Sequence, residues 1–459
     1  MTINKNIKIL VLFIIIILIN MICRAFDISD IYTKYAMITG FAIYCWISGV
    51  IAMTIVAIAL PVMYLVFGIA NAQTVFSPWS TTVPWLCLGG LIIGEMLTNC
   101  GLTTRLSYKC MLITGDSFLR VLIGIMLAGI VLAPLIPTVL GKGAIIFLVG
   151  SGICQTLKID PESKESAVIM MVCLFAVTAP SYGFLTSCVQ IPLAVQLMQS
   201  VSPVKITWVE YMYHNLVPAI IYSIISFYSV LLVLKPQKIE GIRKIVQENY
   251  SKLGPITVNE KKAIVLLVII LILLVGESVH GINAAWCMIM IAGLTFAPGI
   301  DLMDSKSFDK IGFSLLYFLA GAMSIGSVAA SIGIATEMAN VAVGFLSENQ
   351  PLIHLLFSYL LSVTAVLFLT PTTGLAAMSV PLTEISLSIG ADPRIMLYSF
   401  FFGSDMYFMP YQYGVVLLLV SFKRVALKYL MQTLFVKFLL STLILLPLAF
   451  AYWHLLGLL

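Results

Sequence analysis

Four short stretches rich in proline, glycine and hydroxyl-bearing residues interrupt the long apolar runs of this chain, and they are where its chemistry could occur. Residues 137–142 and 370–374 each separate two apolar arms, whereas residues 179–183 and 410–414 each break a longer apolar segment. Because proline cannot continue a helix, each stretch frees backbone amides and carbonyls. Helix N-termini attract anions, and freed carbonyl and hydroxyl oxygens attract small cations. One proline kink is ordinary, but four breaks in two matched pairs favour a binding site for a small charged solute.

The predicted site consists of the residues at these breaks and directly beside them. Serine and threonine supply hydroxyl groups, and the tyrosine and glutamine residues add further hydroxyl and amide groups. Each tyrosine could equally be a packing residue. The predicted substrate- or ion-binding set is Pro137, Thr138, Val139, Gly141, Lys142, Pro180, Ser181, Tyr182, Pro371, Thr372, Thr373, Gly374, Ser404, Asp405, Pro410, Tyr411, Gln412 and Tyr413.

The composition places these breaks in a membrane protein. Of the 459 residues, 61% are hydrophobic and 10% are charged, against about 25% charged residues in soluble proteins. This excludes a soluble enzyme, a disordered chain and a nucleic-acid-binding protein. The apolar runs are long and do not alternate, so the expected fold class is an all-α polytopic membrane protein surrounded by the lipid bilayer.

Two charged members of the set would lie at membrane depth. A lysine at the centre of a bilayer costs about 2.5–3.5 kcal/mol, so Lys142 needs an ionic partner, a hydrated cavity or an anion. The alternative is that its side chain reaches cytoplasmic water from a shallow position. Asp405 precedes the second break, and its candidate roles are counter-ion to Lys142, proton carrier or cation ligand. The alternative for Asp405 is a capping residue that faces water.

Neither a metal site nor an enzyme is expected from the motifs. The nine cysteines lie mostly in apolar runs without a C-x-x-C pair, and the four histidines are isolated. Nucleotide-binding and hydrolase signatures are absent from the sequence. No cofactor is therefore predicted, and sodium is left open as a coupling ion.

The apolar runs divide the chain into two halves of similar layout around one long polar stretch. Each half contains a helical hairpin followed by a broken helix. The predicted segments are a first span and outer loop (1–34), a first repeat (35–234) with hairpin 121–157 and broken helix 166–199, a cytoplasmic linker (235–262), and a second repeat (263–459) with hairpin 352–390 and broken helix 395–422.

Matched landmarks support an internal repeat. Three glycines of the first half recur 232 residues later, the Pro–Thr pair between the arms recurs after 234, and the proline break recurs after 230. If the hairpins enter the membrane without crossing it, each half has five spans, and an odd number makes the two halves inverted. This gives about eleven transmembrane helices and two re-entrant hairpins. If each hairpin arm instead crosses the membrane fully, the number of spans in each half is still odd. The glycine sets are Gly89, Gly94 and Gly101, and Gly321, Gly326 and Gly333.

The charges orient this arrangement. With the N-terminus in the cytoplasm, the predicted inner loops carry 19 lysine and arginine residues and the outer loops carry four. Positive residues are retained on the cytoplasmic side of membranes. The remaining two, Lys142 and Lys437, lie at membrane depth. The expected location is the plasma (inner) membrane, with the C-terminus outside.

The layout resembles the divalent anion/sodium symporter family, which transports sulfate and di- or tricarboxylates. The resemblance covers nearly the whole chain. It rests on the glycine-rich spans 88–102 and 318–335, on Trp46 in an early span, and on the breaks at Pro180 and Pro410. It implies a small anionic substrate, a homodimer and an elevator movement of a transport domain.

The hairpin tips depart from the family pattern. Members carry Ser-Asn-Thr at each tip, which helps bind sodium and substrate, whereas this chain has proline and threonine at residues 137–138 and 371–372. The resemblance therefore predicts the fold and the general role of this chain better than it predicts the coupling ion. Our hypothesis is that the charge of Lys142 replaces a sodium ion, giving a sodium-independent exchanger or a proton-coupled carrier. The alternatives are a carrier of a different solute and a transport-inactive sensor or subunit that retains the fold.

Overall fold

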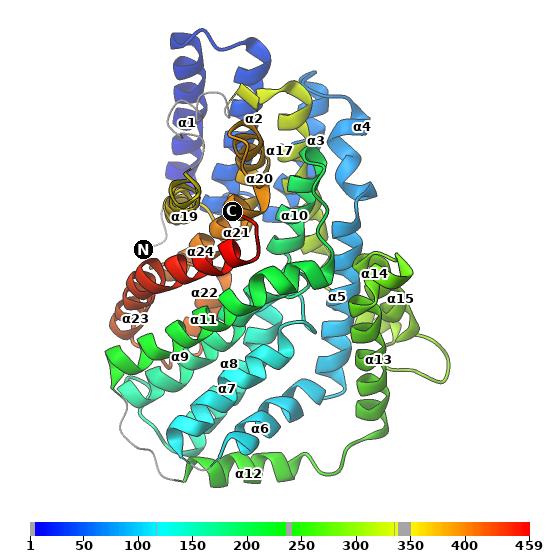
Figure 1. The fold of residues 1–459 in the computed structure, drawn as a ribbon, viewed down its shortest axis with the longest axis vertical. Helices are drawn as coiled ribbons and strands as arrows, with labels where there is room; N and C mark the ends of the chain where they lie inside the picture. The colour runs from blue at the N-terminus through cyan, green and yellow to red at the C-terminus, as the bar shows by residue number, and fades with distance from the viewer. Residues whose placement is uncertain (1–4, 116, 236–240, 335, 338–349) are drawn as a thin grey trace.

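The computed structural model describes residues 5–115, 117–235, 241–334, 336–337 and 350–459. All regular secondary structure in these ranges is helical (Figure 1). Eight helical stretches of the described chain are long and apolar enough to cross a membrane. The expectation of an all-α polytopic membrane protein is therefore confirmed, while the number of eleven spans stays a prediction.

The helices follow one another along the chain with short connections. The first half contains α1 (Lys5–Ala25), α2 (Asp30–Ser48), α3 (Met53–Val66), α4 (Ala72–Phe76), η1 (Ser77–Ser80), α5 (Thr82–Asn99), α6 (Leu102–Thr114), α7 (Phe118–Leu132), α8 (Val139–Thr156), α9 (Lys164–Thr178), η2 (Ala179–Gly183), α10 (Gln190–Val201) and α11 (Trp208–Leu234). The second half contains α12 (Ile242–Lys252), α13 (Val258–Val275), α14 (Glu277–His280), α15 (Ala284–Leu294), α16 (Ser305–Asp309), α17 (Phe313–Ile332), α19 (Pro351–Phe368), α20 (Pro371–Ser388), α21 (Pro393–Ser404), η3 (Pro410–Gln412), α22 (Gly414–Ser421), α23 (Leu427–Leu440), η4 (Ser441–Leu445) and α24 (Leu446–Leu455).

The two glycine-rich helices each pack against a helix of the other half. Helix α5 lies along α15, and α17 lies along α3. A Cβ atom on Gly89 would approach the backbone of α15 to 2.9 Å, and one on Gly321 would approach the backbone of α3 to 2.4 Å. These contacts require glycine because any side chain would separate the helices. The glycine spacing noticed in the sequence therefore marks two equivalent helix–helix contacts.

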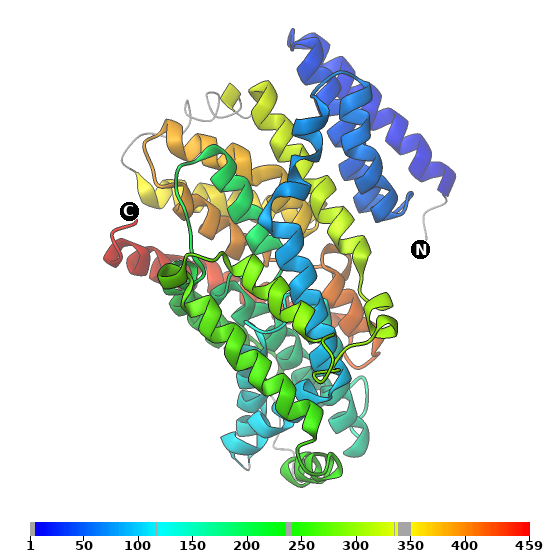
Figure 2. The same cartoon turned by 90° about the vertical axis from the view of Figure 1, so that its right-hand side faces the viewer.

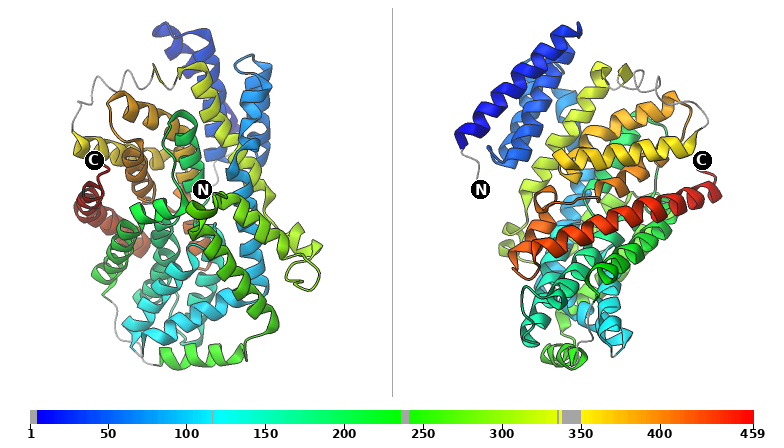
Figure 3. Two further views of the ribbon diagram at one scale, coloured as in Figure 1. Left: turned by 45° about the vertical axis from the view of Figure 1, so that its right-hand side comes forward. Right: turned by 90° about the vertical axis from the view of Figure 1, so that its left-hand side faces the viewer.

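The hairpins also pack against helices of the opposite half. Helix α8 packs on α22, and α20 packs on α10, so the second arm of each hairpin contacts the second part of the other half's broken helix. Helices α11 and α23 pack together, and they run across one face of the molecule (Figure 3). Helices α1 and α2 project to one side (Figure 2). This arrangement surrounds the first helix break with protein, as irregular backbone at membrane depth requires, whereas Met409 and Gly414 at the second break are exposed.

The hairpin tips differ from the sequence prediction. The arms were expected at 121–136 and 143–157, but α7 ends at Leu132 and α8 begins at Val139. Gly141 and Lys142 therefore lie in the first turn of α8, whose N-cap is Thr138. Likewise, residues 371–374 form the first turn of α20. The physical reason is capping: a threonine hydroxyl accepts from a backbone amide of the first turn and so begins the helix early.

Two stretches between the apolar runs also contain helices. Residues 102–120 contain α6, and the linker 235–262 contains α12 and the beginning of α13. Arg105 on α6 forms a buried ion pair with Glu260 at 2.6 Å, which joins α6 to α13. Helix α12 lies beneath α6–α8 at the bottom of Figure 1. Residues 236–240 of the linker, and residue 335 at the end of a predicted span, are outside the described ranges.

Candidate functional site

Lys142 lies in the interior of the protein, next to the first helix break. Its side chain is fully buried. The Nζ atom donates to Ser181 Oγ at 2.5 Å and to the carbonyl oxygen of Ser187 at 2.9 Å. Both acceptors belong to the segment between α9 and α10, and both are uncharged. In the described part of the chain, no carboxylate forms an ion pair with Lys142.

Side-chain hydrogen bonds stabilise the irregular backbone of the first helix break. Ser181 Oγ donates to the Val177 carbonyl at 2.8 Å, and Ser187 Oγ donates to the Ser181 carbonyl. Tyr211 on α11 donates its hydroxyl to the Tyr182 carbonyl at 3.0 Å. These bonds satisfy carbonyls that a continuous helix would use internally. The backbone therefore keeps its irregular path and presents oxygen atoms to Lys142.

Asp405 lies at the second break, where α21 ends, and it is also fully buried. Its cationic partner is Lys437 on α23, whose Nζ lies 3.3 Å from Oδ2 and 2.7 Å from the Asp405 carbonyl oxygen. Tyr222 donates to the same carboxylate at 2.6 Å. The candidate role of Asp405 as counter-ion to Lys142 is therefore wrong. The role as a water-facing capping residue is also wrong because the side chain has no exposed surface.

Aromatic rings complete the surroundings of Lys437. The Nζ atom lies 4.5 Å from the ring centre of Tyr407, 5.3 Å from that of Phe175 and 5.4 Å from that of Tyr222. The faces of aromatic rings attract cations at these distances. The sequence indicated that Lys437 was at membrane depth but gave it no role. A second lysine in an apolar run was the available signal, and its partner depends on packing between distant helices.

A chain of hydrogen bonds links the second break to the first and then to the second hairpin. Tyr182 donates to Asp405 Oδ1 at 3.4 Å, and Gln190 Nε2 donates to the Tyr182 hydroxyl at 3.0 Å. Thr372, in the first turn of α20, donates to Gln190 Oε1 at 3.4 Å. Of the predicted residues, Ser181, Tyr182, Lys142, Asp405 and Thr372 are thus brought into one region around η2. Gln190, Ser187, Tyr222 and Lys437 belong to this region but were absent from the predicted set.

Other predicted residues form hydrogen bonds with backbone groups or lie at helix ends. Ser404 donates to the Phe401 carbonyl at 2.7 Å, and Gln412 Nε2 donates to the Val366 carbonyl at 2.9 Å. The Thr373 amide donates to the capping hydroxyl of Thr370 at 3.3 Å. Buried Val139 and Pro371 are the first residues of their helices, Gly374 closes the first turn of α20, Pro180 lies in η2, Pro410 begins η3, and the Tyr413 ring lies 5.4 Å from that of Tyr407. The side chain of Tyr411 lies outside what the structure describes.

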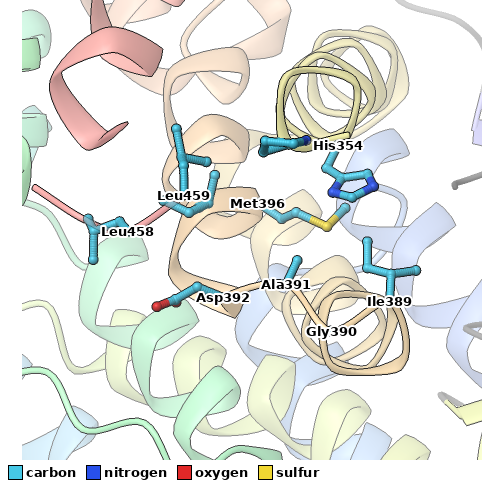
Figure 4. Close-up of a pocket in the computed structure, with 10 residues that line it drawn as sticks. His354, Ile389, Gly390, Ala391, Asp392, Met396, Leu458 and Leu459 are labelled. Atoms are coloured by element: carbon cyan, nitrogen blue, oxygen red, sulfur yellow. The ribbon is translucent and has the colours of Figure 1, made fainter. Parts of the chain in front are cut away.

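The first hairpin borders a cavity of about 160 Å³ between α5 and α8. Pro137, Thr138 and Gly141 line it on one side, and Glu95 and Lys310 contribute charged groups. A larger cavity of about 250 Å³ lies beside α19 and α21 (Figure 4). None of the predicted site residues lines that second cavity. Of these two cavities, the one beside the first hairpin therefore adjoins the predicted site.

Comparisons with known proteins agree with this architecture. The family model described as the sodium:sulfate symporter transmembrane region matches residues 3–459. A Cupriavidus necator protein named "Membrane protein" is 26% identical, over 72% of this chain and 71% of its own length. The L-tartrate/succinate antiporter of Shigella dysenteriae is 23% identical, over 69% of each chain.

A solved structure shares the fold. The crystal structure of the Alcanivorax borkumensis YdaH transporter superposes with a TM-score of 0.55 at 13% identity, covering 86% of this chain and 88% of that chain. At this identity the likeness concerns the fold alone. The family match over nearly all residues is the stronger finding, and it confirms the resemblance seen in the sequence. The chain is a multi-pass membrane transporter, not an enzyme, and it belongs to the sodium:sulfate symporter family.

Proposed function

We propose that this protein is a secondary active transporter of small divalent anions, with di- or tricarboxylates as the main substrate class and sulfate as the second. The observation that carries the proposal is the fully buried charge of Lys142, which contacts only neutral oxygen atoms. A buried positive charge without a counter-ion favours the approach of an anion. The family and the L-tartrate/succinate antiporter among the relatives support the same substrate class.

The coupling we propose is exchange without sodium. The Ser181 hydroxyl and the Ser187 carbonyl are the kinds of oxygen atoms that ligate small cations. In this protein they accept hydrogen bonds from the Lys142 ammonium group instead. A tethered cation would supply a positive charge without a sodium gradient. The antiporter among the relatives is consistent with this coupling.

The proposed mechanism is an elevator movement within an inverted repeat. The hairpins and broken helices pack on one another across the halves, while the pairs α5–α15 and α3–α17 form a separate set of glycine-mediated contacts. A group containing the breaks could slide as a body against the second group. We propose plasma-membrane location, a cytoplasmic N-terminus, an outer C-terminus and a homodimer, as the charge distribution and the resemblance imply.

Uptake into proteoliposomes tests the substrate class. Labelled succinate, citrate and sulfate are offered with and without internal unlabelled anion, using wild type, Lys142→Gln and the matched control Lys205→Gln, whose lysine lies on an exposed loop. We expect uptake of at least one divalent anion by wild type and Lys205→Gln, and a strong loss in Lys142→Gln. Uptake of only neutral or cationic analogues would favour a carrier of another solute. No uptake of any solute would favour a transport-inactive relative.

A further inference from the structure

The surroundings of Lys437 have the composition of a binding site for a monovalent cation. One carboxylate oxygen and one carbonyl oxygen, both from Asp405, accept from the ammonium group. The rings of Phe175, Tyr222 and Tyr407 line the rest. A carboxylate together with several aromatic faces is the arrangement by which proteins recognise organic ammonium ions. The side chains of both charged residues have no exposed surface, so the site is closed to solvent.

The helix break creates this site. Helix α21 ends at Ser404, and the next regular turn begins at Pro410. The last carbonyls of a helix have no partner within it, and the C-terminal end of the helix dipole attracts positive charge. The Asp405 carbonyl and carboxylate both point at Lys437 from this position. Backbone and side chain therefore combine to hold a cation at the end of α21.

The occupied site is connected to the second hairpin. Tyr182 and Tyr222 donate to the Asp405 carboxylate, and Tyr182 accepts from Gln190. Gln190 in turn accepts from Thr372 at the start of α20. Lys437 thus holds the Asp405 carboxylate in place. The hydrogen bonds through Tyr182 and Gln190 connect that carboxylate to the second hairpin. Lys437 is a positioning residue because it acts through Asp405 and Tyr182.

We infer that the enclosure formed by Asp405, Phe175, Tyr222 and Tyr407 is a monovalent-cation site whose natural occupant is tethered to the protein as Lys437. Removal of the amine vacates the site for a free small cation, such as an alkylammonium ion or sodium. The corresponding surroundings of Lys142 contain no carboxylate among their hydrogen-bond acceptors. The two lysines therefore differ in whether a free cation can replace them.

Chemical rescue of the purified full-length protein tests the inference. Lys437→Ala removes the equivalent of a propylammonium ion, whereas Lys437→Met fills the same space without charge. We expect n-propylammonium to raise the melting temperature of Lys437→Ala by several degrees, with methylammonium giving a smaller shift. Wild type and Lys437→Met should not respond, and n-propanol, which lacks the charge, should not stabilise Lys437→Ala. A sodium-dependent shift confined to Lys437→Ala would also support the inference.

Three results would overturn it. The first is a folded Lys437→Ala variant that responds to no cation. The second is an equal response in Lys437→Met, which would place the binding elsewhere. If Lys437→Ala fails to fold, it is produced in the presence of propylammonium, and failure to recover folded protein is the third. Because melting is measured without substrate, an error in the proposed transport function would leave these readings unchanged.

Transport provides the second readout. In Lys437→Ala proteoliposomes, propylammonium on both sides should restore anion uptake that the variant has lost. Lys142→Ala, treated in the same way, should show no restoration because its site lacks a carboxylate. Restoration in Lys142→Ala but not in Lys437→Ala would contradict the assignment of the cation site.

Discussion

The two buried lysines occupy related positions beside the two helix breaks, but their partners differ. Lys142 lies in the first turn of the second arm of the first hairpin and donates to a hydroxyl and a carbonyl oxygen. Lys437 lies on α23 and donates to a carboxylate as well as a carbonyl. The first region therefore holds a lysine with neutral partners, and the second holds a lysine–aspartate ion pair. Burial alone therefore does not define the role of a lysine. The charge of its hydrogen-bond partner does.

The two lysines should also differ in the free energy lost when each is removed. Removing one member of a buried ion pair costs about 3–5 kcal/mol because the other charge stays buried and unpaired. Removing a buried charge that has only neutral partners relieves its desolvation cost and leaves hydrogen-bond acceptors unsatisfied, at about 1–3 kcal/mol each. We therefore expect substitution of Asp405 or Lys437 to reduce stability more than substitution of Lys142.

The largest expected effect is on stability in the second region. Asp405→Asn leaves the Lys437 charge buried without its carboxylate, so the free energy of unfolding should fall by about 3–5 kcal/mol. Thermal melting in detergent would measure this. The double variant Asp405→Asn/Lys437→Met, which removes both charges, should recover most of the loss. A double variant no more stable than Asp405→Asn would show that the charges are not coupled.

Lys142→Gln should affect transport far more than stability. Glutamine can still donate to Ser181 or Ser187, but the positive charge is gone. We expect anion uptake to fall at least tenfold, which corresponds to about 1.4 kcal/mol of lost binding or barrier stabilisation. The melting temperature should change less than in Asp405→Asn. Normal uptake by a folded Lys142→Gln protein would remove Lys142 from the proposed mechanism.

A smaller effect is expected from the cap that positions Lys142. The Thr138 hydroxyl accepts from the Gly141 amide at 3.1 Å at the start of α8. Thr138→Ala should cost about 1 kcal/mol and should weaken uptake by loosening the first turn. Thr138→Ser keeps the hydroxyl and serves as the matched control. Equal uptake by the two variants would mean that the cap does not position Lys142.

The smallest effect should come from the link between the regions. Gln190→Leu removes hydrogen bonds to Tyr182 and Thr372 without altering any charge. Net losses of about 0.5–1.5 kcal/mol per hydrogen bond are typical. We expect a modest decrease in melting temperature and a measurable slowing of exchange. Exchange at the wild-type rate would show that the second hairpin moves independently of the Asp405–Lys437 pair.

Much of the fold follows from local sequence features. Proline and glycine identify the helix breaks because their backbone effects act within a few residues, and the glycine spacing indicates the internal repeat. The hairpin tips differ from the prediction because threonine caps begin the second arms early. Thr370 followed by Pro371 is typical of an N-cap followed by the first helical residue, so it indicates a helix start rather than a turn.

The pairing of charges could not be predicted in the same way. Asp405 meets Lys437 only because α11, α21 and α23 come together, and no sequence spacing encodes that contact. Lys142, the partner that the sequence suggested for Asp405, lies on the first hairpin and binds the segment at the other break. Depth in the membrane was predictable from apolar runs, whereas the partner of each buried charge required the packed structure.

The most direct test of the account is the sodium dependence of exchange by the wild-type protein. Labelled succinate counterflow is measured in proteoliposomes with sodium on both sides and with sodium replaced by N-methylglucamine. The account predicts equal counterflow in the two media, and loss of counterflow in Lys142→Gln in both. Counterflow by wild type that requires sodium would contradict the claim that the Lys142 charge replaces the coupling ion.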